Sequence, residues 1–569
     1  MLDEDVVAHK NFDLRKAGSS QLSLWSSGIP RHRRLIKLCL LLVSILLLRN
    51  VMFAESLPPI SATISFSPTN AGRIINPAFC GLSYGKFMFT NNLFTATNTP
   101  LLNMFSQISP GLLRIGGNST DKTCWGGLSN LPAVTASQID AFAGFVHALP
   151  RNWHVLYGIN MSVNVPTNAT AEASYVANAL GSRLLGFEIG NECDLYHLNG
   201  IRPTNYDYAQ FLVQWQALAS AITNAVPGWA RTNSGIGWAL TGPVDYLDSG
   251  DYALPFAQDE PRVISMLTTH YYLADGLSSK STMALLLQSD TNLPRAVSNL
   301  AAAAEAARLP LGYRCDECGS YANGGSPKIS DAYGSALWAV DFMFTQALNG
   351  SQGVNFNGGE DDLLYSPIGY NESNVLQARP ELYGIKLFSL LPQGSAIPAL
   401  ISLDTNINFT AYGVRQADGG ISAVLNNKET NISVKATINL GPNVTAATVL
   451  ELTGPALNST NGYTIGGAQI NADGSWIASP QSIIIATNNQ FALTLPTITA
   501  ILLRPLQIPQ LTFSRQEQNG GRFVLSWTNA GFSVQAATDP CGPFTNVTDA
   551  SPYVVTTTNS HSFYRLRVN

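Results

Sequence analysis

The sequence contains few charged residues. Asp, Glu, Lys and Arg make up 12% of its 569 residues, and 32 basic against 37 acidic side chains give a net charge of −5. A nucleic-acid-binding protein shows a basic stripe or a high pI, which this chain lacks. Its hydrophobic content of 45% excludes a disordered chain as well. The composition therefore indicates a globular protein whose length suits three to four domains.

Cysteine is scarce too. There are seven, and Cys39 lies in an apolar run near the N-terminus, so six belong to the rest of the chain. Six cysteines in roughly 515 residues do not build a disulfide scaffold. The pair Cys315 and Cys318 has the CxxC spacing of zinc and redox sites, but no second CxxC or CxxH pair accompanies it. We therefore expect neither a metal site nor a cofactor.

Long hydrophobic runs are missing except for residues 35–48, which follow the basic stretch Arg31-His32-Arg33-Arg34. A transmembrane helix needs about 20 apolar residues, and this run has about fourteen. A basic flank before a short apolar run is typical of a signal peptide or a short membrane anchor. We expect residues 1–54 to be one of these two. The remainder is then secreted or periplasmic, and in the second case attached to a membrane through residues 35–48.

Between residues 79 and 385, short apolar runs alternate with longer segments of helical periodicity. This alternation predicts βα units and a parallel sheet. The expected strands are Phe79–Lys86, Leu112–Gly117, His154–Met161, Leu184–Glu192, Ala230–Ile236, Ile264–Tyr272, Leu311–Glu317 and Gly353–Gly358. The expected helices are Ala136–Leu149, Ala171–Leu180, Asn205–Ala225, Leu293–Leu309 and Ser330–Leu348. Eight strands with helices between them favour an α/β fold of the (β/α)8 TIM-barrel type over an open doubly wound sheet.

After residue 385 the helical patterns stop, and short strands alternate with turns rich in Gly, Asn and Pro. This pattern predicts an antiparallel β-sandwich. The stretch Ile60–Phe66 alternates as a strand, and we expect it to join the same sheet. The predicted organisation is an N-terminal strand segment over 55–78, a catalytic barrel over 79–385, a β-sandwich over 386–505 and a small β module over 506–569.

Two glutamates end strands of the predicted barrel. Glu192 ends the fourth and Glu317 the seventh, and the carboxyl ends of barrel strands meet on one face. Glycoside hydrolysis needs such a pair, because one carboxyl group protonates the leaving oxygen while the other attacks or activates water. Glu188 has the same inward parity as Glu192 and is expected to be buried and paired. Asp316 precedes Glu317 and is expected to point the opposite way.

Longer strings around these residues carry a resemblance to a known family. They are Leu-Leu-Arg114-Ile-Gly-Gly-Asn118-Ser-Thr-Asp121, Gly186-Phe-Glu188-Ile-Gly-Asn191-Glu192, Thr-His270-Tyr271-Tyr272 and Asn355-Phe-Asn-Gly-Gly359. Over roughly residues 60–505 the sequence resembles glycoside hydrolase family 79, the β-glucuronidase and heparanase family of retaining barrel glycosidases.

The resemblance implies a retaining mechanism with Glu192 as general acid/base and Glu317 as nucleophile. It also implies roles in substrate binding: Asn191 for the hydroxyl beside the reacting carbon, Asn118 for the sugar, Tyr271 as a hydrogen-bond donor to the nucleophile, and the backbone N–H of Gly324 with Tyr365 for a substrate carboxylate. His270, a lone histidine beside two tyrosines, is expected to be a hydrogen-bonded wall residue of the site, with a proton shuttle as the alternative. Backbone N–H groups on a Gly-rich turn suit an anion because they converge without crowding by side chains.

The chain departs from the family pattern at two positions. Gly85 stands where family members often have an acidic residue, and Ala322 stands where they often have a tyrosine, with Tyr321 one position early. The first change removes a contact to outer hydroxyls of the sugar, and the second weakens the hold on a carboxylate. Lys86 is a candidate replacement partner for that carboxylate, and a solvated lysine is the alternative.

The sequence thus predicts an exported glycoside hydrolase that cleaves a terminal β-linked uronic acid from a glycan or glycoside by double displacement. One alternative keeps the mechanism and takes a neutral or modified sugar. Another is a non-catalytic carbohydrate-binding protein. No nucleic-acid partner is expected, and Trp527 in the terminal module is expected in its core rather than as a sugar platform.

Overall fold

The computed structural model describes residues 57–568 except for 68, 230–237, 247–251, 360–362, 372–374, 443, 507–510, 517–521, 529–531 and 556–561. The predicted signal or anchor segment and the predicted strand Ala230–Ile236 lie outside the described residues. Within the described part, no helix combines the length and the apolar character needed to cross a membrane.

Eight strands form a closed parallel barrel, in which each strand is hydrogen-bonded to two others. They are β3 (Cys80–Gly85), β4 (Gly111–Gly116), β7 (Trp153–Ile159), β8 (Leu184–Ile189), β9 (Ala239–Tyr246), β10 (Ile264–Tyr272), β11 (Tyr313–Gly319) and β12 (Val354–Gly359). The predicted TIM-barrel fold is confirmed, and seven of the eight predicted strands overlap a barrel strand.

The fifth barrel strand is not where the sequence suggested. It is β9, and it contains Gly242 and Pro243, which on sequence grounds indicate a turn. The strand accommodates them with a bulge, because Pro243 and Asp245 pair with consecutive residues of β10 while Val244 between them has a φ of 64°.

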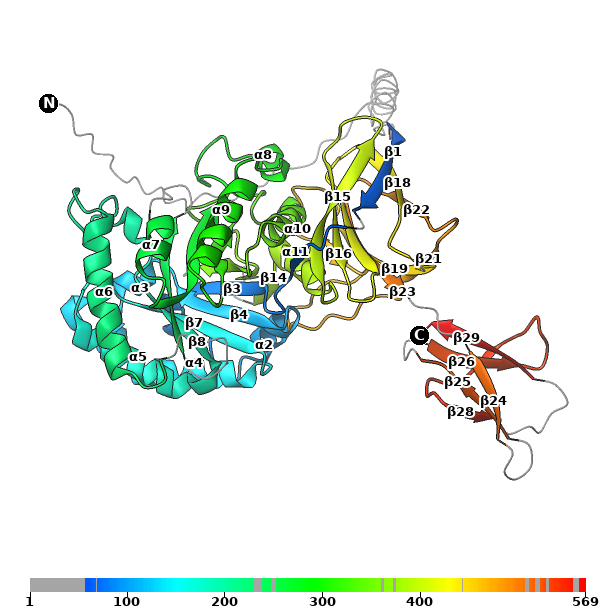
Figure 1. Cartoon of the computed structure of the whole chain (residues 1–569), viewed down its shortest axis with the longest axis horizontal. Helices are drawn as coiled ribbons and strands as arrows, with labels where there is room; N and C mark the ends of the chain where they lie inside the picture. Colours follow the sequence, from blue (N-terminus) through cyan, green and yellow to red (C-terminus); the bar gives the residue numbers. More distant parts are fainter. Residues whose placement is uncertain are drawn as a thin grey trace, which may run out of the picture. The chain divides into compact units, whose positions relative to one another are not determined.

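Helices surround the barrel (Figure 1). Those of eight residues or more are α2 (Thr99–Ser106), α4 (Ala136–Ala148), α5 (Pro166–Leu180), α6 (Tyr208–Ala225), α9 (Leu293–Ala306), α10 (Tyr333–Leu348) and α11 (Pro380–Ser389). Shorter ones are α3 (Ser119–Lys122), α7 (Ala253–Asp259) and α8 (Met283–Leu287). Capping boxes fix the starts of two of them, with Thr135 and Gln138 at α4 and Asp207 and Gln210 at α6.

A large antiparallel sheet region folds into the β-sandwich. Its strand order is β20-β19-β23-β17-β16-β15-β1-β18-β22. The bounds are β1 (Leu57–Phe66), β15 (Ser395–Leu403), β16 (Phe409–Arg415), β17 (Ile421–Asn427), β18 (Ile432–Ile438), β19 (Ala446–Thr453), β20 (Thr464–Ile465), β22 (Phe491–Leu495) and β23 (Thr499–Leu506). Strand β1 precedes the barrel in the chain, and it pairs with both β15 and β18 of the sandwich.

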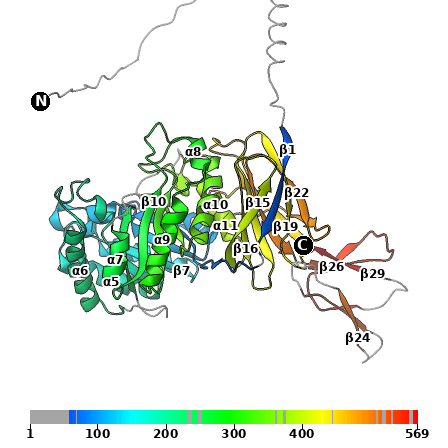
Figure 2. The same cartoon turned by 45° about the horizontal axis from the view of Figure 1, so that its top comes forward.

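The sandwich layer that contains β17 and faces the barrel has apolar residues on both of its faces. Ala423 and Leu425 of β17 lie in the core between the two layers, whereas Val424 belongs to the core shared with the barrel. Helices α10 and α11 lie between the barrel strands and this layer (Figures 1 and 2). Because both faces of β17 are covered, all seven of its residues are buried.

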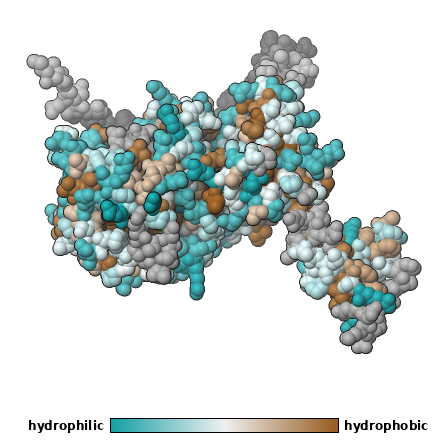
Figure 3. Space-filling model, in the orientation of Figure 1, coloured by the Kyte–Doolittle hydropathy of each residue, from teal (hydrophilic) through white to brown (hydrophobic). Residues whose placement is uncertain are grey.

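The terminal module contains two three-stranded sheets, β24 (Thr512–Gln516), β25 (Arg522–Ser526) and β28 (Tyr553–Val555), and β27 (Thr545–Thr548), β26 (Phe532–Ala537) and β29 (Phe563–Val568). Trp527 belongs to its core, and its indole N–H donates to the carbonyl of Phe532. On the face of the molecule shown in Figure 3, hydrophobic residues are scattered rather than gathered into one broad patch.

Candidate active site

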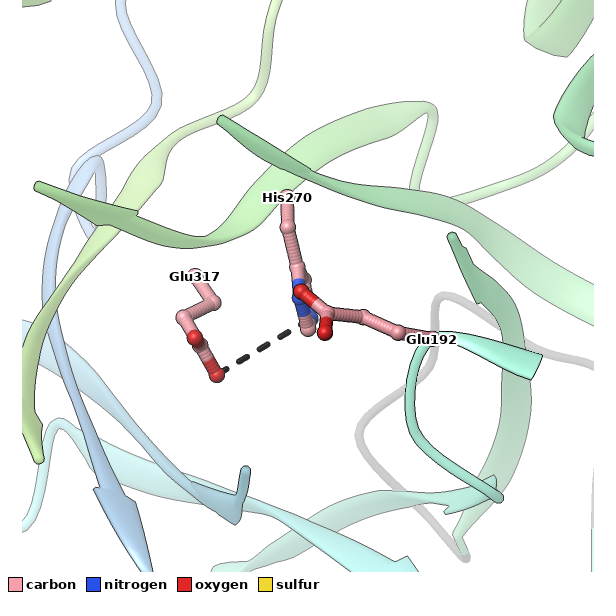
Figure 4. Close-up of side chains that lie close together, drawn as sticks. All are labelled: Glu192, His270 and Glu317. Atoms are coloured by element: carbon pink, nitrogen blue, oxygen red, sulfur yellow. Dashed lines mark hydrogen bonds and ion pairs between the residues drawn. The ribbon is translucent and has the colours of Figure 1, made fainter. Parts of the chain in front are cut away.

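The carboxyl ends of the barrel strands surround a cleft with about 480 Å³ of free space. Glu317 lies near the end of β11, and Glu192 follows β8, at the start of a short 3-10 turn, Cys193–Leu195, where its φ is 48°. Both side chains line the cleft and extend toward His270 (Figure 4). One carboxylate oxygen of each glutamate and one ring nitrogen of His270 all lie within 4.8 Å of one another.

Glu317 is held by three donors. One oxygen accepts from Arg114 Nη1 at 2.6 Å, and the other accepts from the Tyr272 hydroxyl at 2.9 Å and from Asn357 Nδ2 at 3.2 Å. Burial raises the pKa of Glu317, but the charges of His270 and Arg114 and the hydrogen bonds from Tyr272 and Arg114 outweigh it, so the pKa lies below its ordinary value. This carboxyl group is therefore ionised at neutral pH.

Glu192 has a different environment. Its side chain is 14% exposed, and its Oε1 lies 2.9 Å from Nδ1 of His270. His270 is fully buried, and its Nε2 lies 4.0 Å from both Glu317 and Asp316 without a hydrogen-bond partner. The histidine thus stands between the two glutamates and contacts the more exposed one directly.

Arg114 of β4 connects the residues beneath the cleft. Its guanidinium donates to Glu188 at 2.7 Å, to Ser83 at 3.1 Å and to Asn191 at 2.9 Å, in addition to Glu317. Burial lowers its pKa, but the surrounding carboxylates raise it further, so the pKa lies above its ordinary value. Glu188 is buried and paired, as expected. Sequence reasoning gave Arg114 no role, although a charged residue inside the apolar run Leu-Leu-Arg-Ile was a usable signal.

The expected orientation of Asp316 was wrong. Thr269 of β10 pairs with Cys315 and the next residue, His270, pairs with Glu317, so Asp316 is the extra residue of a β-bulge. The bulge interrupts the alternation of sides, and Asp316 Oδ2 lies 3.3 Å from Arg114 Nε inside the barrel. Burial, followed by the charge of Glu188, raises the pKa of Asp316 well above its ordinary value.

The predicted role of Tyr271 was also wrong. Its hydroxyl donates to Asp290 at 2.8 Å and its ring stacks on Phe342 of α10, outside the barrel. The neighbouring Tyr272 donates to Glu317 instead. Side chains alternate along a strand, so His270 and Tyr272 face the interior together and Tyr271 faces outward. The sequence alone could have predicted this, because the three residues are consecutive in an expected strand.

Asn191 and Asn118 lie together beside Glu192. Asn191 Nδ2 lies 3.5 Å from Asn118 Oδ1, and the backbone N–H of Asn191 donates to Asp121 at 3.0 Å. Asn118 lines the main cleft and also a second one, of about 430 Å³, whose lining includes Lys122 and Asn199. Asn118 therefore lies at the junction of the two clefts, and Asn191 lines the second one.

The predicted carboxylate-binding residues Gly324 and Tyr365 both line the main cleft, as do Gly85 and Ala322. Tyr321 does not replace the missing tyrosine, because its hydroxyl donates to the carbonyl of Thr282. Lys86 is neither solvated nor available to a ligand. It is buried and paired with Glu172 at 2.6 Å.

Cys315 and Cys318 form neither a disulfide nor a metal-binding group with their described neighbours. In the described part of the chain, the residues close enough to share a metal ion are Glu192, His270 and Glu317. The guanidinium of Arg114, 2.6 Å from Glu317, opposes a second cation there.

No protein family model matches the chain. A β-glucuronidase from Neurospora crassa is 24% identical over 242 residues, which cover 38% of this chain and 42% of that protein. A β-glucuronidase from Aspergillus niger is 24% identical over 397 residues, which cover 62% of this chain and 68% of that protein. The chain thus spans less than half the length of the first of these relatives.

Solved structures share the fold. A 4-O-α-L-rhamnosyl-β-D-glucuronidase from Fusarium oxysporum matches with a TM-score of 0.61 and 19% identity, over 78% of this chain and 99% of that one. A family 51 arabinofuranosidase from Xanthomonas axonopodis matches with a TM-score of 0.57 and 13% identity, over the same shares. The comparisons confirm the resemblance to glycoside hydrolase family 79, and they support a glycoside hydrolase.

Proposed function

The chain resembles family 79 glycoside hydrolases, and we propose that it hydrolyses β-glycosides with retention of configuration at the anomeric carbon. Glu317 is the nucleophile and Glu192 is the general acid/base. The observation that carries the proposal is the closeness of the two carboxyl groups, with oxygens within 4.8 Å of each other. Retaining enzymes place the pair about 5–5.5 Å apart, whereas inverting enzymes leave about 6.5–9.5 Å for a water molecule.

The surroundings of the two glutamates support this division of roles. A nucleophile must be ionised and held in place, and Glu317 accepts three hydrogen bonds and has a lowered pKa. An acid/base must exchange protons with the substrate and with water, and Glu192 is the more exposed of the two. His270 contacts Glu192 directly and is suited to positioning it.

The reaction proceeds in two displacements. In the first, Glu317 attacks the anomeric carbon and the bond to the leaving oxygen breaks as Glu192 protonates that oxygen, giving a glycosyl ester. In the second, Glu192 removes a proton from a water molecule that attacks the same carbon, and the ester bond to Glu317 breaks. Asn191 precedes Glu192 and accepts a hydrogen bond from Arg114, and in this proposal it binds the hydroxyl group beside the reacting carbon.

Two relatives named β-glucuronidase and the family motifs support a terminal β-linked uronic acid as the sugar. Export to a secreted or periplasmic location is also part of the proposal, supported by the basic and apolar residues 31–48. Sequencing the N-terminus of protein isolated from its native host tests the cleaved and the anchored forms.

The first experiment is a panel of aryl β-glycosides of glucuronate, glucose, galactose and xylose. We expect turnover of at least one of them and, by proton NMR, first release of the β-anomer. A 2-deoxy-2-fluoro glycoside of the same sugar should label Glu317, which peptide mass spectrometry can locate. First release of the α-anomer, or a label on another residue, would contradict the mechanism.

Variants assign the two roles separately. Glu192→Ala should lower kcat by about 10²–10⁴-fold, the usual share of general acid/base catalysis. Added azide should restore turnover of a substrate with a good leaving group and yield the β-glycosyl azide. Glu317→Gln should remove turnover, whereas Glu305→Gln on the outer helix α9 serves as a control. Binding of sugar without product in all of these assays would favour the carbohydrate-binding alternative.

A further inference from the structure

Four hydrogen-bond donors surround the buried carboxyl group of Asp121, which lies in α3 after strand β4. Its Oδ1 accepts from the backbone N–H groups of Met161 at 2.8 Å and Ser162 at 3.0 Å, in the loop after β7. Its Oδ2 accepts from the backbone N–H of Asn191 at 3.0 Å and from the hydroxyl of Tyr196 at 2.6 Å, both after β8. One side chain thus connects three consecutive loops at the carboxyl end of the barrel.

The two donors to Oδ2 stand at the two ends of segment 191–196, which contains Glu192. The backbone N–H of Glu192 donates to the carbonyl of Val244 on β9 at 2.8 Å. Two successive N–H groups are therefore held by different parts of the barrel, that of residue 191 by Asp121 and that of residue 192 by β9.

The backbone of Glu192 depends on such contacts. Its φ of 48° and ψ of 51° lie in the left-handed region, which is uncommon for a residue other than glycine. A conformation of this kind persists where the surrounding structure imposes it. His270 contacts the carboxyl group of Glu192, but the backbone decides from which point and in which direction that side chain extends.

The nucleophile is held by a different set of residues. Glu317 accepts its hydrogen bonds from Arg114, Tyr272 and Asn357. These three donors lie on β4, β10 and β12, so none of them belongs to the segment that Asp121 holds. Loss of the Asp121 contacts should therefore disturb the acid/base and leave the nucleophile in place.

We propose that Asp121 is a positioning residue for the general acid/base. Through the backbone of Asn191 and the hydroxyl of Tyr196, it holds Glu192 where that group can exchange a proton with the leaving oxygen and with water. The inference rests on the proposed function and adds a residue that acts without touching the reacting atoms. Its effect on rate is expected because a displacement of about 1 Å in an active site can cost about 100-fold.

Asp121→Asn tests this with little change of shape. It replaces one acceptor oxygen by an NH2 group, which cannot accept a hydrogen bond. Oδ1 accepts from two backbone N–H groups and Oδ2 from one, so we expect the NH2 group at the Oδ2 position, opposite the N–H of Asn191. Asp140→Asn is the matched control, because Asp140 accepts from Tyr175 on the exposed side of α4.

The first measurement compares kcat/KM for 2,4-dinitrophenyl and phenyl β-glycosides of the best sugar in the panel. Dinitrophenolate leaves without protonation, whereas the phenyl glycoside needs the general acid. Asp121→Asn should lower the value for the phenyl glycoside by about tenfold or more beyond any change for the dinitrophenyl glycoside. Asp140→Asn should leave the ratio of the two unchanged. A merely structural role of Asp121 would lower both values in parallel.

The second measurement follows the base role of Glu192. A 2,4-dinitrophenyl 2-deoxy-2-fluoro glycoside should label Glu317 in Asp121→Asn at nearly the rate of the unaltered protein, because neither the acid nor the hydroxyl beside the reacting carbon takes part. Reactivation in buffer requires Glu192 to remove a proton from water. It should be slower in Asp121→Asn by about tenfold or more.

Failure of the inference and failure of the proposed function give different results. Parallel loss for both leaving groups, or reactivation at the rate of the unaltered protein, would overturn the inference and leave the retaining mechanism standing. No turnover of any glycoside by the unaltered protein would overturn the proposed function, and the inference with it.

A second variant decides the matter if Asp121→Asn does not fold. Tyr196→Phe removes one of the four hydrogen bonds and keeps the bond from the N–H of Asn191. It should shift the ratio for the two leaving groups in the same direction by about threefold or more, whereas Tyr175→Phe should not. An unchanged ratio in Tyr196→Phe would then overturn the inference.

Discussion

At the scale of single residues, the chemistry depends on how Glu317 is held. Arg114, Tyr272 and Asn357 come from three different strands, and each donates to the same carboxylate. Such charge-assisted bonds are stronger than neutral ones and fix the orientation of the acceptor. The neighbouring tyrosines on β10 offer a clean comparison, because Tyr272 contacts the carboxylate and Tyr271 lies outside the barrel.

We expect Tyr272→Phe to lower kcat/KM by roughly 10- to 100-fold, since it removes one hydrogen bond to a charged group. Tyr271→Phe removes the bond to Asp290, which lies outside the barrel, so it should reduce stability by about 1 kcal/mol and leave kcat near that of the unaltered protein. Steady-state kinetics and thermal unfolding of both variants measure this. Equal loss of activity in both would show that the two hydroxyl groups act through stability alone.

The same substitution should change the pH profile. Glu317 must be ionised to attack, and the Tyr272 bond is one of the causes of its lowered pKa. Removing that donor raises the pKa, so the acid limb of kcat/KM should move to higher pH in Tyr272→Phe. Tyr271→Phe should keep the original limb. An acid limb that moves to lower pH would contradict the assigned contact.

At the scale of elements, the bulge in β11 determines which side chains share the centre of the barrel. It places Asp316 and Glu317 on the same side, so that Arg114 contacts both. Burial raises the pKa of Asp316 well above its ordinary value, which favours the neutral acid at this position. An amide therefore fits the site as well as the acid does.

Asp316→Asn should accordingly keep most of the stability and activity. Asp316→Leu should destabilise the fold by about 1–3 kcal/mol, because it leaves buried polar neighbours without a partner, and should lower kcat as Arg114 shifts. Urea unfolding together with kinetics measures both effects. If Asp316→Asn is as damaging as Asp316→Leu, the carboxyl group is charged in the folded protein, and the inference that it is neutral is wrong.

The strands also show what sequence periodicity can predict. Seven barrel strands and the identity of the two glutamates follow from alternation and from polar strand ends, since these depend on local pattern. Bulges do not, because an extra residue is defined by the pairing between two strands rather than by the pattern within one. The misplaced fifth strand with Val244, and the reversed Asp316, are both bulge sites. The prediction for Tyr271 failed for a different reason. Alternation along β10 puts Tyr272, and not Tyr271, on the same side as His270, so this contact to Glu317 could have been predicted from the sequence.

At the scale of the whole molecule, the interior holds several carboxyl groups whose pKa is raised. Burial is the leading cause for Asp121, Asp245, Asp316 and Glu381. A raised pKa means that the folded state binds these protons more tightly than the unfolded state. Stability is then lost as pH rises from the unfolded value of about 4 toward the folded one. Glu317 acts in the opposite direction.

We therefore expect the Tm to be higher near pH 5 than near pH 8. Glu381→Gln, which removes one of these buried acids outside the cleft, should flatten the slope, and Glu305→Gln on the surface of α9 should not. Calorimetry across this range tests the sign. A Tm that rises with pH would show that these groups are ionised in the folded state.

The position of β1 has a consequence for synthesis. This strand lies inside the sandwich sheet, yet its partners β15 and β18 follow about 340 and 375 residues later, after the whole barrel. At 5–20 residues per second, the ribosome needs on the order of 20–70 s to make that stretch. During this time β1 has unpaired backbone groups and alternating apolar side chains, a state prone to association with other chains. The sandwich can therefore be completed only after the strands that precede and follow the barrel in the chain have both been made.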